Sequence, residues 1–295
     1  MMKKIFTLSV AMVIMAVLWS GCNGAGKKSI VVGAKDFTEQ DILGNMLKLL
    51  ITAKTDIPVE YKHEMSSNVV FAAIKSGDID VYMDYTGTVY GNYLGYSEIK
   101  PAEEVYAIAV KEFKARYNLL MLKPLGFNNT YTLSVRTDTA EKYGLQTYSD
   151  LAKASSELIL GATFEVLNRN DGIPNLKKVY NLSFKAEKAI DGTLRYTAME
   201  HDDIQVTDAF STDGMLIQYN LVVLEDDQHF FPPYYAVPVI REATAKKYPE
   251  LLPLLDTLTN VLDDNTMRGL NYQVDVLKVN PAEVAREFLQ GKGLI

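Results

Sequence analysis

The first hundred residues alternate between short apolar runs and apolar residues at helical spacing. Residues 29–32, 59–62 and 79–81 read as buried strands. Apolar residues recur every three or four positions over residues 42–50 and 69–74, which predicts a helix after each of the first two strands. This β-α-β-α-β order favours a parallel, doubly wound sheet, a fold that binds ligands beyond the carboxyl ends of its strands.

Polar residues and glycine indicate where these two helices begin and end. Thr38 and Asp41 have the spacing of a capping box, which predicts a helix start at Thr38. Gly77 follows the second helix at the place where a left-handed residue commonly ends a helix. The loop 34–37 is therefore expected at the carboxyl end of the first strand.

The second half of the chain repeats this α/β character. Further strands are predicted at residues 131–135, 158–166, 204–206, 221–223 and 235–240. From Arg241 onward the apolar spacing is helical. The predicted fold is therefore α/β with two lobes, each a doubly wound sheet flanked by helices, and a ligand cleft between the lobes.

The amino-terminal residues have the pattern of an export signal. Lys3 and Lys4 precede an apolar run over residues 5–18, and Cys22 is the single cysteine of the chain. The small residues before this cysteine make the segment resemble the lipobox of bacterial lipoproteins, although Trp19 stands where leucine is usual. We expect residues 1–21 to be a signal peptide and residues 22–28 a linker after a lipidated Cys22, which would anchor an extracytoplasmic protein to the membrane.

Composition and motifs narrow the function classes. The 295 residues carry a formal net charge of −7 and no dense Lys/Arg cluster, so a nucleic-acid partner is not expected. The chain has no G-x-S-x-G, P-loop, H-E-x-x-H or C-x-x-C motif. The acidic stretches beside His201 and His229 are interpreted as solvated loops. We therefore expect no catalytic residue, no cofactor and no metal site.

Aromatic residues gather at the ends of predicted strands. The chain has 18 tyrosines, and Tyr85, Tyr131, Phe210 and Tyr234 each lie in a turn-like segment at a strand terminus. For any one of them, core packing is the simpler interpretation. Four such positions at strand ends indicate that aromatic rings line the cleft.

Six segments in these regions resemble blocks of the glycine betaine/carnitine/choline-binding proteins of ABC importers. They occur in the family's order and span essentially the whole chain after the signal. They are GAKDFTEQ (33–40), SGDIDVYMDYTGT (76–88), GFNNTY (126–131), NRNDG (168–172), FSTDG (210–214) and FPPYY (231–235).

The resemblance implies a site for a quaternary ammonium compound. A trimethylammonium group has no N–H, so aromatic faces select it through cation–π attraction and contact with its methyl groups. The family's aromatic cage maps onto Tyr85, Tyr131, Phe210 and Tyr234. The positions that it uses around the polar end of the ligand map onto Lys35, Thr88 and Arg169, with a further donor near Asn129.

The resemblance also implies partners and a domain division. We expect lobe I to comprise residues 29–128 and 233–295, lobe II to comprise residues 129–232, and the protein to deliver its ligand as a monomer to membrane permease subunits. Glycine betaine or proline betaine is favoured, because choline has no carboxylate for Lys35 and Arg169. A choline- or carnitine-preferring receptor and an extracytoplasmic enzyme are the alternatives.

Overall fold

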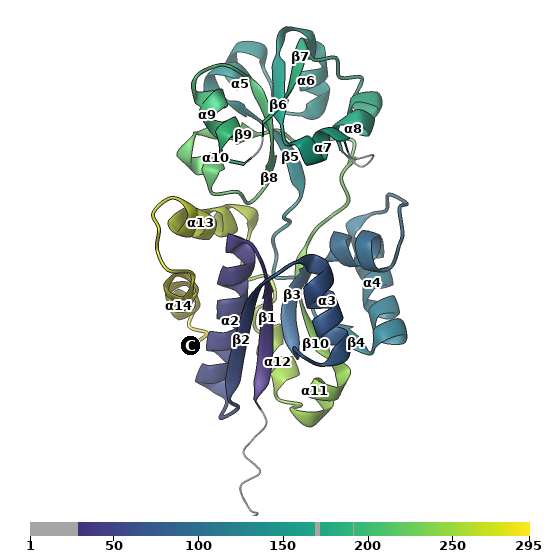
Figure 1. Ribbon diagram of the computed structural model, residues 1–295, viewed down its shortest axis with the longest axis vertical. Helices are drawn as coiled ribbons and strands as arrows, with labels where there is room; N and C mark the ends of the chain where they lie inside the picture. The colour runs from purple at the N-terminus through teal and green to yellow at the C-terminus, as the bar shows by residue number, and fades with distance from the viewer. Residues whose placement is uncertain (1–28, 169–171, 191) are drawn as a thin grey trace, which may run out of the picture.

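The computed structural model describes residues 29–168, 172–190 and 192–295, and it has two lobes stacked along the long axis of the molecule (Figure 1). Each lobe is built on a five-stranded sheet. The predicted signal peptide, Cys22 and Arg169 lie outside the described residues. The two-lobed α/β fold expected from the sequence is confirmed.

Lobe I contains the first three strands and receives two more from later in the chain. Its sheet has the order β2-β1-β3-β10-β4, in which β1 is parallel to β2 and β3, whereas β10 is antiparallel to β3 and β4. The parallel arrangement predicted for the first three strands is confirmed, and the complete sheet is mixed. The strands are β1 (Ile30–Lys35), β2 (Val59–Met65), β3 (Val81–Tyr85), β4 (Leu119–Met121) and β10 (Ala236–Arg241).

Lobe II repeats this topology. Its sheet has the order β7-β6-β8-β5-β9, with β6 parallel to β7 and β8, and β5 antiparallel to β8 and β9. In each sheet four strands therefore run in one direction, and a single strand, β10 in lobe I and β5 in lobe II, runs in the opposite direction. The strands are β5 (Tyr131–Arg136), β6 (Ile159–Ala162), β7 (Ala186–Ala189), β8 (Val206–Phe210) and β9 (Leu221–Val223).

Helices cover both faces of each sheet (Figure 1). In lobe I they are α2 (Thr38–Lys54), α3 (Ser67–Ser76), the π-helix η1 (Thr88–Tyr93), α4 (Ala102–Tyr117), α11 (Glu242–Lys247), α12 (Leu251–Asp256), α13 (Asp264–Asp275) and α14 (Pro281–Gly291). In lobe II they are α5 (Thr137–Tyr143), α6 (Tyr148–Ala154), the 3-10 turn η2 (Ser155–Glu157), α7 (Phe164–Asn168), α8 (Ile173–Tyr180), α9 (Leu194–Glu200) and α10 (Met215–Gln218).

Strand β3 shows why helices are needed on both faces of the lobe I sheet. Successive strand side chains point to opposite faces. Val81 and Met83 belong to the cluster under α2, whereas Tyr82 belongs to the cluster under α3 and α4. Because both faces are apolar, each must be covered by helices, which gives the doubly wound arrangement.

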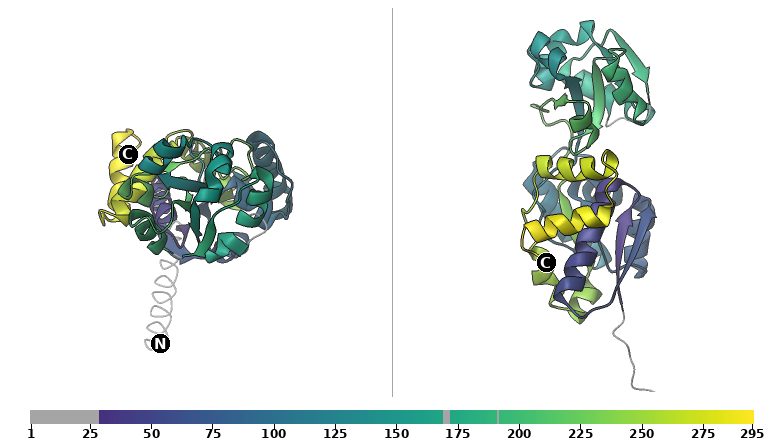
Figure 2. Two further views of the ribbon diagram at one scale, coloured as in Figure 1. Left: turned by 90° about the horizontal axis from the view of Figure 1, so that it is seen from above. Right: turned by 90° about the vertical axis from the view of Figure 1, so that its left-hand side faces the viewer.

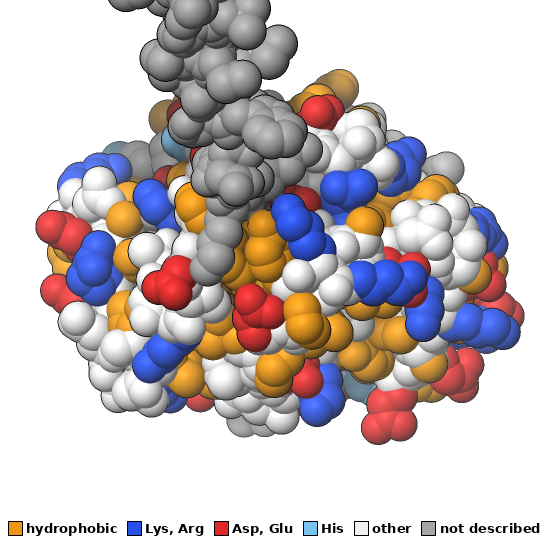
Figure 3. Space-filling model, turned by 90° about the horizontal axis from the view of Figure 1, so that it is seen from below, with side chains coloured by type: hydrophobic (Ala, Val, Ile, Leu, Met, Phe, Trp, Pro, Cys, Tyr) orange, Lys and Arg blue, Asp and Glu red, His pale blue; other side chains and the backbone are white. Residues whose placement is uncertain are grey.

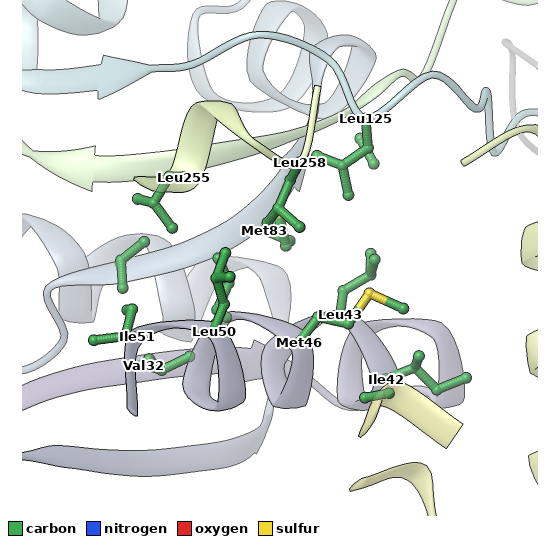
Figure 4. Packing of buried hydrophobic residues seen from close by; sticks show 14 of the residues in the cluster. Val32, Ile42, Leu43, Met46, Leu50, Ile51, Met83, Leu125, Leu255 and Leu258 are labelled. Carbon is green, nitrogen blue, oxygen red and sulfur yellow. The ribbon is translucent and has the colours of Figure 1, made fainter. Parts of the chain in front are cut away.

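Helix α2 supplies the largest part of the lobe I core. Its residues Ile42, Leu43, Met46 and Leu50 are fully buried and pack against Val32 and other residues of the sheet (Figure 4). Full burial of one such side chain contributes about 1.5–3 kcal/mol relative to leaving it exposed. Helices α13 and α14 lie against the other side of α2 and complete this layer (Figure 2).

Two local predictions are wrong. The Thr38 hydroxyl does not cap α2, because it donates to Asp275 Oδ1 at 2.5 Å, and Asp41 accepts a hydrogen bond from Tyr61. The residue before α2 is Phe37, whose side chain makes no capping hydrogen bond. The strand predicted at residues 158–166 ends at Ala162 in β6, and the rest of that apolar segment starts α7. The glycine helix end is confirmed, since Gly77 has a φ of 93°.

The end of lobe I that points away from lobe II has mixed character. On this face of the described chain, Lys and Arg side chains are interspersed with Asp and Glu side chains and with hydrophobic residues (Figure 3). This face does not concentrate basic charge in the way that phosphate binding requires.

Candidate functional site

A cleft with a volume of about 1110 Å³ lies between the lobes. It is lined by residues of both lobes and of the two segments that connect them. Seven of the eight ligand-binding residues predicted from the sequence line it, namely Lys35, Tyr85, Thr88, Asn129, Tyr131, Phe210 and Tyr234. The eighth, Arg169, lies outside the described residues.

The lobe I wall of the cleft lies at the carboxyl ends of β1 and β3. Tyr85 is the last residue of β3, and only 4% of its surface is exposed. Phe37 follows β1, is 43% exposed and stacks on Tyr85 with the ring centroids 6.3 Å apart. The sequence analysis placed Phe37 in the loop at the carboxyl end of the first strand but did not name it among the ligand-binding residues. It presents more open ring surface to the cleft than Tyr85 does.

Lys35 at the end of β1 already has a partner. Its ammonium lies 2.5 Å from Asp84 Oδ1, and both side chains are buried. Asp84 also accepts hydrogen bonds from the Tyr82 hydroxyl and from the backbone N–H of Tyr85. Lys35 therefore lines the cleft, but its positive charge is balanced within lobe I by Asp84.

The lobe II wall is an aromatic pair at the ends of two strands. Tyr131 begins β5 and lies directly opposite Phe210, the last residue of β8. Their ring centroids are 4.8 Å apart, and Phe231 lies 5.8 Å from Tyr131 on the other side. Phe210 is 41% exposed, although an apolar ring at a strand end would normally be buried. The antiparallel register therefore sets two adjacent rings at the edge of the cleft.

Two connecting segments, residues 122–130 between β4 and β5 and residues 224–235 between β9 and β10, form the floor of the cleft and hydrogen-bond to each other. Asn128 forms an isolated antiparallel bridge with Tyr235. The backbone N–H of Asn129 donates to the Tyr234 carbonyl at 3.1 Å, so this donor is engaged in the connection. The ring of Tyr234 packs closely on Gly87. A Cβ added at residue 87 would lie 2.8 Å from two ring carbons of Tyr234.

Thr88 follows this contact as the first residue of the π-helix η1. It is half-buried and lines the cleft. Short π-helical turns are rare and occur often at functional sites. Here the turn carries the chain from the end of β3 along the cleft wall, which places Thr88 and Tyr90 on the same wall as Tyr85.

Glu39, which the sequence analysis did not single out, lies at the bottom of the cleft. It is 3% exposed and accepts hydrogen bonds from Tyr85 Oη at 2.6 Å, Asn129 Nδ2 at 2.8 Å, Thr212 Oγ1 at 2.6 Å and Asn271 Nδ2 at 3.1 Å. Burial raises the pKa of the Glu39 carboxyl above its usual range, and these four hydrogen bonds act in the opposite direction. Burial and the adjacent Glu39 charge raise the pKa of the Tyr85 phenol, which therefore stays neutral and donates.

A further set of contacts holds one edge of lobe II to lobe I. The side chain of Arg268 in α13 donates from Nε and Nη2 to the Ser211 carbonyl, at 3.0 and 2.6 Å. Asn271 Nδ2 also donates to the Thr212 carbonyl at 2.8 Å. Gly214 packs on α13 so closely that a Cβ would meet the backbone of Tyr272 at 2.6 Å. The loop after β8 is thus attached to lobe I beside Glu39.

Charged residues give the cleft an acidic character. Among the described residues that line it, the acids are Glu39, Glu98, Asp213 and Asp275, and the only base is Lys35. Within the described part of the chain, no group of three or more His, Cys, Asp and Glu side chains is placed to hold a metal ion. None of the described helices combines the length and apolar character that crossing a membrane requires.

Two sheet-based lobes, connected by paired segments and enclosing a cleft lined by residues of both, define the class of two-lobed solute-binding proteins. Comparison with protein families gives the particular family. Residues 28–291 match the substrate binding domain of ABC-type glycine betaine transport systems, and the chain belongs to this family.

Individual relatives agree with this assignment. The chain is 39% identical over 274 residues to the ergothioneine transport permease/ergothioneine binding protein EgtU of Helicobacter pylori, which covers 92% of this chain and 49% of that protein, so the chain spans about half the length of that relative. It is 36% identical over 299 residues to the carnitine transport binding protein OpuCC of Listeria monocytogenes, covering 98% and 97%. A solved structure described as a glycine betaine/carnitine/choline ABC transporter matches with a TM-score of 0.87 and 33% identity, covering 90% of this chain and 99% of that one.

Proposed function

We propose that this protein is the extracytoplasmic binding component of an ABC importer and takes a small quaternary ammonium compound into the cleft between its lobes. The observation that carries the proposal is the aromatic pair of half-buried Tyr131 and exposed Phe210, where β5 begins and β8 ends, on the same cleft as Tyr85 and Tyr234. Rings presented to a cleft with an excess of acidic residues suit a ligand that is positively charged and covered with methyl groups.

In this proposal the cage consists of Tyr85, Tyr131, Phe210 and Tyr234, and Phe37 adds a fifth ring. Each ring contributes about 0.5–2 kcal/mol when it contacts a desolvated cation. Several such contacts amount to a large share of the roughly 8 kcal/mol that micromolar binding requires. Tyr85 and Tyr234 belong to lobe I, and Tyr131 and Phe210 belong to lobe II. A ligand that contacts rings of both lobes therefore favours closure of the cleft.

For the polar end of the ligand we propose Thr88 and Arg169, with a carboxylate-bearing betaine such as glycine betaine or proline betaine as the ligand. Asn129 lines the cleft, but its backbone N–H and its Nδ2 already donate to the Tyr234 carbonyl and to Glu39. The guanidinium of Arg169 suits bidentate binding of a carboxylate. Lys35 supports this choice less than its sequence position suggests, because its charge is balanced by Asp84. Relatives named for carnitine and for ergothioneine make these two betaines the alternatives, with choline as a further one.

The proposal includes the remaining expectations from the sequence. Lobe I comprises residues 29–128 and 233–295, lobe II comprises residues 129–232, and Cys22 carries the lipid that holds the protein at the outer face of the membrane. The protein acts as a monomer that presents its ligand to permease subunits. Membership of a family of transport substrate-binding domains supports binding and transfer without chemical change.

The experiment that tests the proposal is calorimetric titration with a methylation series. Glycine, sarcosine, dimethylglycine and glycine betaine differ only in the number of methyl groups on nitrogen. If aromatic rings select the methylated ammonium group, binding strengthens along the series and is strongest for the quaternary compound. Equal affinity across the series, or binding of glycine alone, would rule out recognition by an aromatic cage.

A further inference from the structure

Glu39 is a buried carboxylate in the cleft for which the proposed cage provides no role. It is the second residue of α2, and its four hydrogen-bond donors come from four separate segments: β3, the first connecting segment, the loop after β8, and α13. Among the described residues, no Lys, Arg or His forms an ion pair with it. A buried carboxylate without a cationic partner is costly, and it calls for a compensating positive charge.

The geometry around Glu39 favours its ionised form. One oxygen receives the Asn129 amide N–H and the other receives the Asn271 amide N–H. All four groups are oriented as donors toward the carboxyl, and the Asn271 amide is fixed in this orientation because its Nδ2 also donates to the Thr212 carbonyl at 2.8 Å. The amino-terminal turn of α2 also favours a negative charge at this position. These donors and the helix terminus stabilise the carboxylate form of Glu39, in opposition to the rise in pKa that burial causes.

Tyr85 connects this charge to the cage. The Tyr85 hydroxyl donates to Glu39 Oε1 at 2.6 Å, and a phenol that donates to a carboxylate has a more electron-rich ring face. The positive charge near this ring, the Lys35 ammonium 5.2 Å from the ring centroid, is already balanced by Asp84. Among the described residues, Glu39 is the charged group beside the ring that has no ion-pair partner.

We propose that Glu39 is a specificity-determining residue that supplies the counter-charge for the ammonium group, so that the cleft recognises the charge of the ligand and not only its shape. This inference rests on the proposed function, since it assigns the selectivity of the same site. Glu39 acts on the ligand through the Tyr85 ring and through its field in the partly desolvated cleft. The alternative is that Glu39 only holds the two lobes together through its hydrogen bonds.

The test compares each ammonium ligand with a compound of the same shape in which carbon replaces nitrogen. Glycine betaine is paired with 3,3-dimethylbutanoate, and choline is paired with 3,3-dimethylbutan-1-ol. For each pair, calorimetry gives the ratio of the dissociation constant of the carbon compound to that of the ammonium compound. Wild-type protein is compared with Glu39→Gln, which removes the charge, and with Thr212→Val, which removes one hydrogen bond to Glu39 and keeps the charge.

Glu39→Gln is compatible with the surrounding hydrogen bonds. Asn129 Oδ1 and Asn271 Oδ1 are buried and have no partner among the described residues. If the Asn129 amide flips, its oxygen accepts a hydrogen bond from the new glutamine N–H₂, whereas Asn271 keeps its orientation because its Nδ2 also donates to the Thr212 carbonyl. Thermal unfolding of each variant verifies that it is folded before titration.

The proposal predicts that Glu39→Gln lowers the ratio by about tenfold or more, because it weakens binding of the ammonium compound and leaves the carbon compound unaffected or bound more tightly. Thr212→Val is expected to keep the wild-type ratio. Equal weakening of both compounds in Glu39→Gln, or an unchanged ratio, would overturn the role of Glu39 and leave the proposed function standing. A wild-type protein that binds carbon and ammonium compounds equally well overturns the inference even if Glu39→Gln does not fold. A wild-type protein that binds no ammonium compound overturns both proposals.

Discussion

Replacement of Tyr131 by alanine isolates the contribution of the lobe II wall to ligand binding. Tyr131 contacts Phe210 at a centroid distance of 4.8 Å and Phe231 at 5.8 Å, so its ring both faces the cleft and supports its neighbours. The loss of one cation–π contact costs about 0.5–2 kcal/mol, and the loss of methyl contact adds to this. We expect the affinity for the quaternary ammonium ligand to fall by about 1–3 kcal/mol, which is about 5-fold to 150-fold.

The same substitution also affects stability. Each aromatic pair contributes about 0.5–1.5 kcal/mol beyond the area that it buries, so Tyr131→Ala is expected to lower the free energy of unfolding by a few kcal/mol. Urea unfolding separates this effect from the effect on binding, and Tyr131→Phe serves as the matched control because it keeps the ring. Near-wild-type affinity in a folded Tyr131→Ala protein would remove Tyr131 from the cage.

Three further predictions concern the framework of lobe I. Lys35→Met leaves the buried Asp84 without its cation and should lower the free energy of unfolding by about 3–5 kcal/mol, whereas a loss below about 1 kcal/mol in urea unfolding would contradict a structural ion pair. Gly126→Ala should destabilise more than Gly144→Ala: both have positive φ values, of 113° and 65°, but only at residue 126 would a Cβ meet a backbone carbonyl, at 2.3 Å. Equal changes in melting temperature would refute this reasoning. Leu50→Ala, in the fully buried face of α2, should cost about 2–5 kcal/mol by the same assay, and a loss under 1 kcal/mol would mean that the site collapses without strain.

The sequence predicted the fold because, in each lobe, short apolar runs that form strands alternate with stretches of helical apolar spacing. The apolar residues 30–32 form part of a buried strand, as their local pattern predicts. Gly77 ends α3 in the left-handed conformation, which is a local preference of glycine. The antiparallel addition of β10 to the lobe I sheet could not be read in this way. That pairing joins residues more than 150 positions apart in the chain, and no local pattern specifies it.

The site was predictable only in part, for a related reason. Strand ends that resemble known blocks placed Tyr85 and Tyr131 on the cleft. The partner of Lys35 could not be seen, because Asp84 lies on a different strand and becomes its neighbour only when β1 and β3 pair. The same holds for Glu39, whose donors are separated from it by between 46 and 232 residues.

At Thr38 the sequence predicted a local contact that the structure does not make. Its position three residues before Asp41 satisfies a local capping rule, but the hydroxyl is taken by Asp275 in α13. A tertiary contact thus replaced the local one. Helix α2 begins at the expected residue nevertheless, because its apolar face and not its cap determines where it packs.

The measurement that tests the central claim most directly is a competition in which the protein selects its own ligand. The protein is incubated with an equimolar mixture of glycine betaine, proline betaine, carnitine, choline, ergothioneine, neutral amino acids and sugars, and is then separated by gel filtration. The retained compound is released by denaturation and identified by mass spectrometry. We predict that a quaternary ammonium compound is retained unchanged at about one molecule per chain. Retention of a compound without a quaternary nitrogen, or of a chemically altered product, would contradict the proposal that this cleft binds a methylated cation and performs no reaction.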